Sequence, residues 1–422
     1  MRGRHLVRAD RGFATGAGPL SRLPALGFAT GFAHVLDRID RGLAQGAIEA
    51  TLPDGTRRML GGRGEGPRAI VELRSWRALV RLVASGSVGW YRAWAEGEWT
   101  SPDPVPLFDL FMRNRTTLGQ AGRARGFSRL LNRIKHSFRR NSRTGARRNI
   151  EFHYDLGNDF YAAWLDRTMT YSSACFAEPI SAAEPLEAAQ ERKVRMLLDR
   201  LSLKPGDELL EIGCGWGGLA CVAARDYGAR VTGITLSAEQ KAYAEARAAA
   251  AGLADQVQFR LADYRDITGR FDAVASVEMV EAVGEAYWPA YLGAIARTLK
   301  PGCRAAIQFI GIDDAIFADY AASADFIQTY IFPGGMLVSE SRFRAAAEAA
   351  ALEWRDVDRF GLHYAETLRR WRQRFDLAVA ENRLPPGFDE AFVRLWRYYL
   401  MYCEGGFRGG GIDVAQVTLI RR

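Results

Sequence analysis

The pattern of hydrophobic and polar positions changes near residue 150. Before that point, short apolar stretches at 48–52 and 69–73 alternate with glycine turns. Apolar residues at helical spacing follow over 76–83, and an aromatic-rich segment at 87–99 closes the region. Strand-length and helix-length patterns within so short a stretch predict a small α+β domain over residues 1–110.

After residue 150 the chain alternates strand-like and helix-like segments. Apolar strands are predicted at 208–212, 230–235, 257–261, 271–276 and 304–309, and a helix at 238–251. Such alternation is typical of a parallel, doubly wound (Rossmann-like) sheet, which binds its ligand at the carboxyl ends of the strands. The predicted fold class is therefore α/β, with a catalytic domain over residues 151–422 and the smaller α+β domain before it.

The segment between the two domains, residues 111–150, is strongly basic. It holds twelve Lys and Arg and no Asp or Glu between Arg113 and Arg148, which is more than the net charge of +8 for the whole chain. Apolar residues between 127 and 138 fall on one face of a predicted amphipathic helix, opposite a row of arginines. The helix either links the domains and packs on its own protein, or lies on a membrane with its arginines on anionic lipid phosphates. No aromatic base-stacking motif accompanies the charge, so nucleic acid is not the expected partner.

The composition limits where the protein is expected to be located and which kinds of site it is expected to contain. No run of 18 apolar residues predicts a membrane span, and glycines and Asp10 interrupt the first 30 residues where a secretory signal would need an apolar core. The five cysteines lack CxxC spacing and the five histidines lack HExxH spacing, which argues against a disulfide framework and a metal site. We expect a cytoplasmic protein without metal, associated peripherally with the inner face of the membrane.

The segment from Glu211 to Gly217, Glu-Ile-Gly-Cys-Gly-Trp-Gly, follows a predicted strand and opens a helix. Glycines at 213, 215 and 217 allow a tight turn and a close approach of ligand to backbone. The third glycine of dinucleotide-binding loops is absent, which disfavours a nicotinamide-dependent oxidoreductase. The motif resembles motif I of the S-adenosylmethionine-dependent methyltransferases, and the resemblance implies that Glu211 lies near the amino group of the methionine moiety.

The next two predicted strands supply further cofactor candidates. The second strand ends without the acid that usually holds the ribose, and the third ends in a polar turn whose Asp263 could accept from the adenine amine while Tyr264 packs on the ring. The candidates of these two turns are Thr235, Leu236, Ser237, Gln240, Asp263, Tyr264 and Arg265.

Six separated motifs together indicate a family. They lie at 153–160 (HYDLGNDF), 170–176 (TYSSACF), 211–217, 233–237 (GITLS), 330–335 (YIFPGG) and 399–408 (YLMYCEGGFR). The chain closely resembles the cyclopropane-fatty-acyl-phospholipid synthase family, which includes the mycolic acid cyclopropane synthases. The match covers residues 150–422, and 90–103 resembles the end of the family's N-terminal domain. The resemblance implies transfer of a methylene group from S-adenosylmethionine to the cis double bond of fatty-acyl chains in membrane phospholipids, giving a cyclopropane ring.

The resemblance also implies the site residues. Tyr171 and Ser172 would close over the cofactor, together with the turns named above and with Gly213, Cys214, Gly215, Trp216 and Gly217. Glu281, Tyr364 and Cys403 would surround a bound bicarbonate beside the transferable methyl group. Glu281 is expected to orient the base, and Cys403 to line the site rather than to act as a nucleophile.

Two positions depart from the family pattern, and both concern removal of a proton. Methylation of an isolated alkene leaves a carbocation, which a base must quench before water intervenes. The family typically has cysteine at Ser173 and histidine at Gln308; Ser173 could keep a backbone contact to an anion, whereas Gln308 donates hydrogen bonds but cannot shuttle protons. Ring closure is the favoured expectation, and a methyl- or methylene-branched chain is the alternative product. A non-catalytic lipid-binding protein is a third reading, and a homodimer is left open.

Overall fold

The computed structural model describes residues 25–119, 156–323 and 325–422. The chain forms two compact units, each built from separated segments. The N-terminal unit comprises 1–138, 318–333 and 385–411, and the sheet unit comprises 139–317, 334–384 and 412–422. The division predicted at residues 110 and 150 did not anticipate that two later segments belong to the N-terminal unit.

The N-terminal unit contains a four-stranded sheet in the order β2-β1-β3-β4. β1 (Ala47–Thr51) pairs antiparallel with β2 (Arg57–Gly61) and parallel with β3 (Arg68–Leu73), which pairs antiparallel with the short β4 (Trp99–Thr100). Three helices of the same region are α2 (Ala25–Gly42), α3 (Arg77–Ala95) and α4 (Val105–Arg113). This arrangement matches the predicted α+β domain. On α3, however, Val80 and Val83 are exposed, although the apolar spacing had placed them with the buried Leu79 and Leu82.

Two helices from late in the chain complete this unit, α13 (Phe326–Tyr330) and α16 (Glu390–Arg408). The ring of Tyr91 on α3 lies 4.9 Å from Phe326 and 5.0 Å from Tyr398, centroid to centroid. α16 also packs closely on α4, since a Cβ built at Gly405 would lie 2.4 Å from the Cβ of Phe108. Aromatic contacts and a small residue at the helix crossing therefore hold the motif 399–408 in the N-terminal unit.

The sheet unit is built on strands in the order β11-β12-β9-β8-β5-β6-β7, with β10 (Val338–Ser339) paired to β9. The parallel strands are β5 (Glu208–Ile212), β6 (Arg230–Thr235), β7 (Val257–Leu261), β8 (Phe271–Val277) and β9 (Leu299–Ile312). β12 (Ile412–Arg421) runs antiparallel between β9 and β11 (Leu352–Arg359). Strand order reverses between β5 and β8, which is the switch point of a doubly wound sheet and confirms the predicted fold class.

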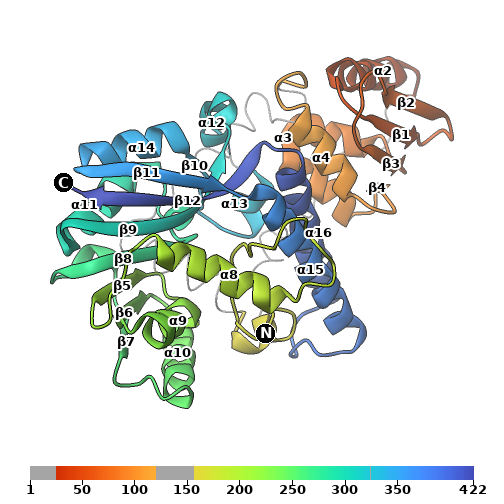
Figure 1. Cartoon of the computed structure of the whole chain (residues 1–422). Coiled ribbons are helices and arrows are strands. Elements are labelled where there is room, and N and C mark those ends of the chain that lie inside the picture. Colours follow the sequence, from red (N-terminus) through yellow and green to blue (C-terminus); the bar gives the residue numbers. More distant parts are fainter. Residues whose placement is uncertain (1–24, 120–155, 324) are drawn as a thin grey trace. The chain divides into compact units, whose positions relative to one another are not determined.

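Helices cover both faces of this sheet (Figure 1). On one face, α8 (Leu186–Asp199), α9 (Gly218–Tyr227) and α10 (Ala238–Ala250) bury an aliphatic core that includes Leu197 and Leu209. On the other face, α11 (Trp288–Thr298) and α14 (Glu340–Ala349) meet the sheet through rings, with Phe343 at 5.9 Å from Phe309. Alternate residues of β9 therefore face different helix layers, and Gln308 and Ala306 face α8.

The remaining elements of the described chain are short or lie near the strand ends. They are α7 (Asn158–Ala162), η2 (Tyr264–Asp266), η3 (Val280–Ala282), η4 (Glu285–Tyr287), α12 (Asp314–Ala321) and α15 (Gly361–Ala380). No helix among the described residues has both the length and the apolar character needed to cross a bilayer. Most of the predicted basic helix at 111–150 lies outside the described residues, so both interpretations of it stay predictions.

Candidate active site

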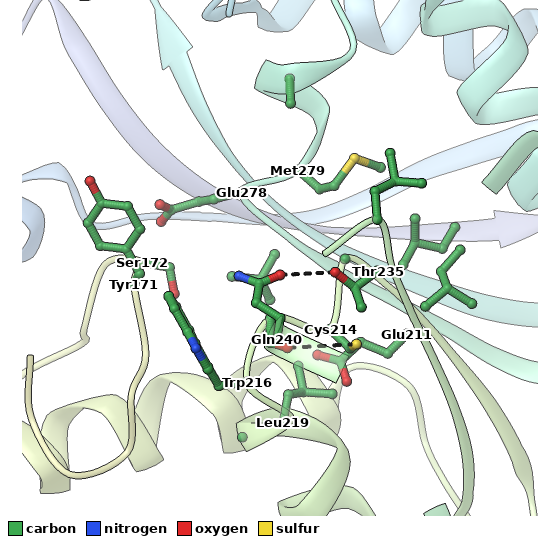
Figure 2. A pocket seen from close by; sticks show the side chains of 18 of the residues that line it. Tyr171, Ser172, Glu211, Cys214, Trp216, Leu219, Thr235, Gln240, Glu278 and Met279 are labelled. Carbon is green, nitrogen blue, oxygen red and sulfur yellow. Dashed lines mark hydrogen bonds between the residues drawn. The ribbon is translucent and has the colours of Figure 1, made fainter. Parts of the chain in front are cut away.

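A pocket opens at the carboxyl ends of β5, β6, β7 and β8, across the switch point of the sheet. Residues from four strand-end turns, from α8 and from the loop 169–172 line it, and Figure 2 shows Glu211, Thr235, Gln240 and Glu278 around the same space. Of the predicted cofactor residues, those that line it are Tyr171, Ser172, Glu211, Gly213, Cys214, Gly215, Trp216, Thr235, Leu236, Gln240, Asp263, Tyr264 and Arg265. The structure thus brings together turns that are up to 94 residues apart in the sequence.

The glycine turn after β5 divides into ligand-facing and packing positions. Gly213 has φ +85° and a Cβ there would lie 2.8 Å from Cγ of Met279, whereas a Cβ at Gly215, with φ +50°, would meet no protein atom within 4 Å. Gly215 therefore leaves room for a ligand against the backbone. Gly217 was predicted to contact the cofactor, but it does not line the pocket. A Cβ there would strike Phe259 and Ala244, so its glycine serves helix packing.

Glu211 is buried and lines the pocket next to this turn. Among the described residues its Oε2 has no hydrogen-bond partner, and burial raises the pKa of its carboxyl to about 8. A buried acceptor without a partner is costly, and an ammonium group in the pocket would satisfy it. The site therefore fits a ligand that carries a primary amine, as the methionine end of S-adenosylmethionine does.

The turns after β6 and β7 are ordered by short-range hydrogen bonds. Thr235 Oγ1 donates to Gln240 Oε1 at 2.9 Å, and Ser237 caps α10 by accepting from the Gln240 amide at 3.2 Å. Ser237 does not line the pocket, so its place in the predicted set is that of a helix cap. Asp263 accepts from Arg265 Nε at 2.8 Å, and the Arg265 guanidinium lies 5.3 Å from the Tyr264 ring centre.

α8 brings a fully buried amine to the pocket. Lys193 Nζ donates to Ser172 Oγ at 2.6 Å, and burial lowers the pKa of Lys193 to about 8, although Glu278, Asp166 and Glu211 oppose that shift. Sequence reasoning missed Lys193, because one lysine on an amphipathic helix carries no motif. Lys193 thus bonds to the loop that was predicted to close over the cofactor and lies near Glu211 on β5 and Glu278 just after β8.

The centre of the predicted catalytic set is a residue that the sequence analysis did not select. Glu278 follows the last residue of β8 and accepts three hydrogen bonds: from Tyr364 Oη at 2.6 Å, from Gln308 Nε2 at 2.8 Å, and from the Ser173 backbone amide at 2.9 Å. Burial is the main cause that raises the pKa of Glu278, and these donors and Lys193 oppose it. Glu278 lies three residues before Glu281, the acid that was predicted, so the sequence already showed a second acid beside it.

Glu281 has a different environment. Its Oε1 accepts from the backbone amide of Ile310, and its Oε2 has no partner among the described residues. Burial, followed by the charge of Glu278, raises the pKa of Glu281 to about 8. Glu281 therefore contacts the β9 backbone beside Gln308, while Glu278 accepts the side-chain donors.

The hydrogen-bond donors around Glu278 test whether the site can hold the bicarbonate that the family resemblance implied. Ser173, Gln308 and Tyr364 all donate to the carboxylate of Glu278, so the chain itself supplies an anion at these donors. The residues present do not fit a separate bicarbonate bonded to the same three groups. Cys403 lies on α16 in the N-terminal unit, where burial and nearby Asp325 raise the pKa of its thiol, and its role in the site stays a prediction.

Comparison with known proteins agrees with this geometry. The family profile described as mycolic acid cyclopropane synthetase matches residues 141–417. The tuberculostearic acid methyltransferase UfaA1 of Mycobacterium tuberculosis is 41% identical over 347 residues, 81% of this chain and 80% of that protein. The cyclopropane-fatty-acyl-phospholipid synthase of Escherichia coli K12 is 34% identical over 353 residues, 81% of this chain and 85% of the synthase.

A solved structure shows the same relationship in three dimensions. The mycolic acid cyclopropane synthase CmaA1, complexed with SAH and CTAB, superposes with a TM-score of 0.59 at 30% identity, covering 65% of this chain and 97% of that one. The chain therefore belongs to the mycolic acid cyclopropane synthetase family and is an S-adenosylmethionine-dependent methyltransferase of the cyclopropane synthase type.

Proposed function

We propose that the enzyme methylates the double bond of unsaturated fatty-acyl chains in membrane phospholipids and releases a methylene-branched acyl chain. The observation that carries this proposal is the carboxylate of Glu278, held by Tyr364, Gln308 and Ser173 where the family resemblance implied a bicarbonate. Relatives named for fatty-acid methyl transfer and for phospholipid cyclopropanation support the substrate class.

The chemistry requires an electrophile, a dry site and one base. S-adenosylmethionine, held against the glycine turn and Glu211, supplies an electrophilic methyl group. Methylation of one alkene carbon leaves a cation on its neighbour, and Glu278 takes a proton to restore a neutral product. A raised pKa suits a buried carboxylate to this task near neutral pH, because it then binds the proton more readily than an exposed carboxylate does.

The fixed position of Glu278 favours the branched product over the ring. Three donors stabilise its charged form and so make it a weaker base than burial alone would, and Gln308 cannot carry the proton onward. A slower proton removal gives time for a hydride to move from the methylated carbon to the cationic carbon. Loss of a proton from the new methyl group then leaves an exocyclic methylene. The alternative is direct loss of that proton with ring closure, which the 34% identity to the cyclopropane synthase supports.

The basic segment 111–150 supports the choice of a membrane substrate. Twelve Lys and Arg without an acid favour an anionic surface, and phospholipid headgroups provide one where the acyl substrate is found. We propose that this segment attaches the enzyme peripherally to the inner face of the membrane.

Product analysis tests the proposal. The protein is incubated with vesicles of unsaturated phospholipid and S-adenosylmethionine labelled with ¹³C in the methyl group, and the extracted acyl chains are examined by mass spectrometry and NMR. Olefinic signals of the labelled carbon are expected, at rates that do not change when bicarbonate is removed. Labelled ring carbons with high-field protons would establish cyclopropanation instead, and absence of label from lipid would contradict the substrate class.

A further inference from the structure

A chain of hydrogen bonds runs from Glu278 through two neighbouring strands, β9 and β12, to Arg200 at the C-terminal end of α8. Gln308 Nε2 donates to Glu278 Oε1 at 2.8 Å, and Gln308 Oε1 accepts from Gln416 Nε2 at 3.0 Å. Gln416 Oε1 in turn accepts from Arg200 Nε at 3.3 Å. Gln308 and Gln416 are direct cross-strand partners on β9 and β12, and both are 0% exposed.

The orientation of each amide in this chain follows from its neighbours. A glutamine amide could be turned either way, because its oxygen and nitrogen have similar shapes. Gln416 lies between two groups that each allow one polarity: the Arg200 guanidinium only donates, and the backbone carbonyl of Lys193, 3.1 Å from Gln416 Nε2, only accepts. Gln416 must therefore present its oxygen to Arg200 and its nitrogen to Lys193 and Gln308.

The orientation of Gln308 is fixed in turn by Gln416. Because Gln416 offers a donor, Gln308 turns its oxygen toward β12 and its nitrogen toward Glu278. In the opposite orientation an amide oxygen would face the carboxylate, which would repel the ionised form and favour the protonated one. An amide on β12 thus determines whether Glu278 receives a donor or an acceptor.

We propose that Gln416 is a positioning residue for methyl transfer: it holds Gln308 in the orientation that keeps Glu278 ionised and aimed at the substrate. The proposal rests on the proposed role of Glu278 as the base. Gln416 acts on Glu278 through Gln308, since its side chain bonds to Gln308, to the Lys193 backbone and to Arg200, and not to Glu278 itself.

The other charged or titratable groups near Glu278 come from other elements. They are Tyr364 on α15, Lys193 on α8 and Glu281 on η3. A substitution at 416 leaves these side chains in place. Besides its hydrogen bond to Gln308, it removes the bond to the Lys193 backbone carbonyl and an acceptor of Arg200. A change in the acidic limb of the pH profile therefore reports on the Gln308 amide.

The test uses Gln416→Met, which keeps the length of the side chain and removes its hydrogen bonds. The rate of transfer of labelled methyl to phospholipid vesicles is measured from pH 5 to pH 9, whatever the product. We expect the acidic limb to move up by about one pH unit, the size of one lost hydrogen bond to a charged group, with unchanged affinity for S-adenosylhomocysteine. Thr418→Val is the matched control: Thr418 is buried on the same strand and accepts from the same Arg200 at 3.4 Å, but its change leaves the limb in place.

A double-mutant cycle separates positioning from general support of the fold. If Gln416 acts through Gln308, Gln308→Met shifts the limb in the same direction and the double variant shifts it no further. Additive shifts, or an unmoved limb in Gln416→Met, would overturn the proposal. If Gln416→Met does not fold, Gln416→Glu is used instead. Its carboxylate still accepts from Arg200 but offers Gln308 no donor, so the Gln308 amide must reverse. The acidic limb of the pH profile must then still move to higher pH. An active Glu278→Gln variant would show that Glu278 is not the base. An inactive Glu278→Gln variant, together with an unmoved acidic limb in Gln416→Met, would refute the role of Gln416 and leave Glu278 as the base.

Discussion

The phenol of Tyr364 donates a 2.6 Å hydrogen bond to Oε2 of Glu278, which lies 86 residues earlier in the chain. The family resemblance had placed Tyr364 beside a bound bicarbonate. The hydroxyl instead orients a carboxylate, so the tyrosine and the acid act as one unit. Substitutions at Glu278 should therefore affect the chemical step rather than cofactor binding.

We predict that Glu278→Gln lowers the rate of methyl transfer by about 100-fold or more, the usual contribution of a general base, with little change in cofactor affinity. Glu281→Gln is the matched variant, since Glu281 accepts from the Ile310 amide and an amide oxygen can still do so. Its rate should fall much less. Single-turnover measurements with labelled S-adenosylmethionine compare the rates of the two variants. A larger loss of rate in Glu281→Gln would show that Glu281, and not Glu278, is the base.

Cofactor binding should release a proton from Glu211. Burial raises the pKa of this carboxyl to about 8, so at pH 7 it is mostly protonated in the free protein. An ammonium ligand favours the ionised form, and the proton leaves as the ligand binds. Titration calorimetry with S-adenosylhomocysteine in buffers of different ionisation enthalpy should show release of about one proton at pH 7 and little at pH 9.

The matched variant for that experiment is Glu211→Gln, which cannot ionise. It should bind the ligand more weakly and release no proton from this site. Equal proton release in the variant and the original protein would show that another group, such as Lys193, titrates on binding.

A side chain at Gly215 should block the cofactor and lower the stability of the fold only slightly, by the strain of a non-glycine residue at φ +50°. The Cβ would meet no protein atom within 4 Å, so it projects into the space that the ligand needs. Gly215→Ala should weaken S-adenosylmethionine binding by on the order of tenfold or more, which is about 1.4 kcal/mol. Gly252→Ala, where φ is +69° and a Cβ also meets nothing, is the matched control for backbone strain and should bind normally. If calorimetry shows the same affinity for S-adenosylmethionine in Gly215→Ala and in the original protein, the cofactor does not bind against this turn.

The basic segment should act on the membrane and not on the chemistry. Replacing Arg129, Arg133, Arg139 and Arg140 with Gln should weaken binding to anionic vesicles by about 1 kcal/mol for each residue near the surface, and should reduce its dependence on salt. Vesicle sedimentation at low salt measures this. Unchanged binding would favour the interpretation of the segment as a linker helix. As a control, the variant should still transfer methyl groups to detergent-dispersed lipid, and loss of this activity would indicate damage to the fold.

Much of the sheet could be predicted from the sequence because the parallel strands are short apolar runs between helices. β5, β6 and β7 have the predicted bounds. β12 was missed, since Asp413, Gln416 and Thr418 interrupt its apolar pattern, although Gln416 and Thr418 are buried. A strand that buries polar side chains for a hydrogen-bond network looks like an exposed segment, and only its pairing with β9 explains those residues.

The cofactor turns could be located for a related reason: each follows a strand whose end is visible in the sequence. The catalytic centre was harder, because Glu278 gains its meaning from Ser173, Gln308 and Tyr364, which the fold brings to it from three other elements. The sequence shows both acids, Glu278 and Glu281, three residues apart. The turn after β8, where Glu278 has φ +47°, decides which acid meets the side-chain donors. In this turn Glu278 accepts from those donors, whereas Glu281 accepts from the backbone amide of Ile310 on β9.

The place of β12 in the sheet also orders events during synthesis. It lies between β9 and β11, and it is made after every other strand of the sheet unit. A ribosome-bound chain that has released β5 to β9 can already form the glycine turn and the parallel core. It cannot orient Gln308 until Gln416 has left the exit tunnel, so a nascent chain would gain the ability to hold its cofactor before it gains an ordered base.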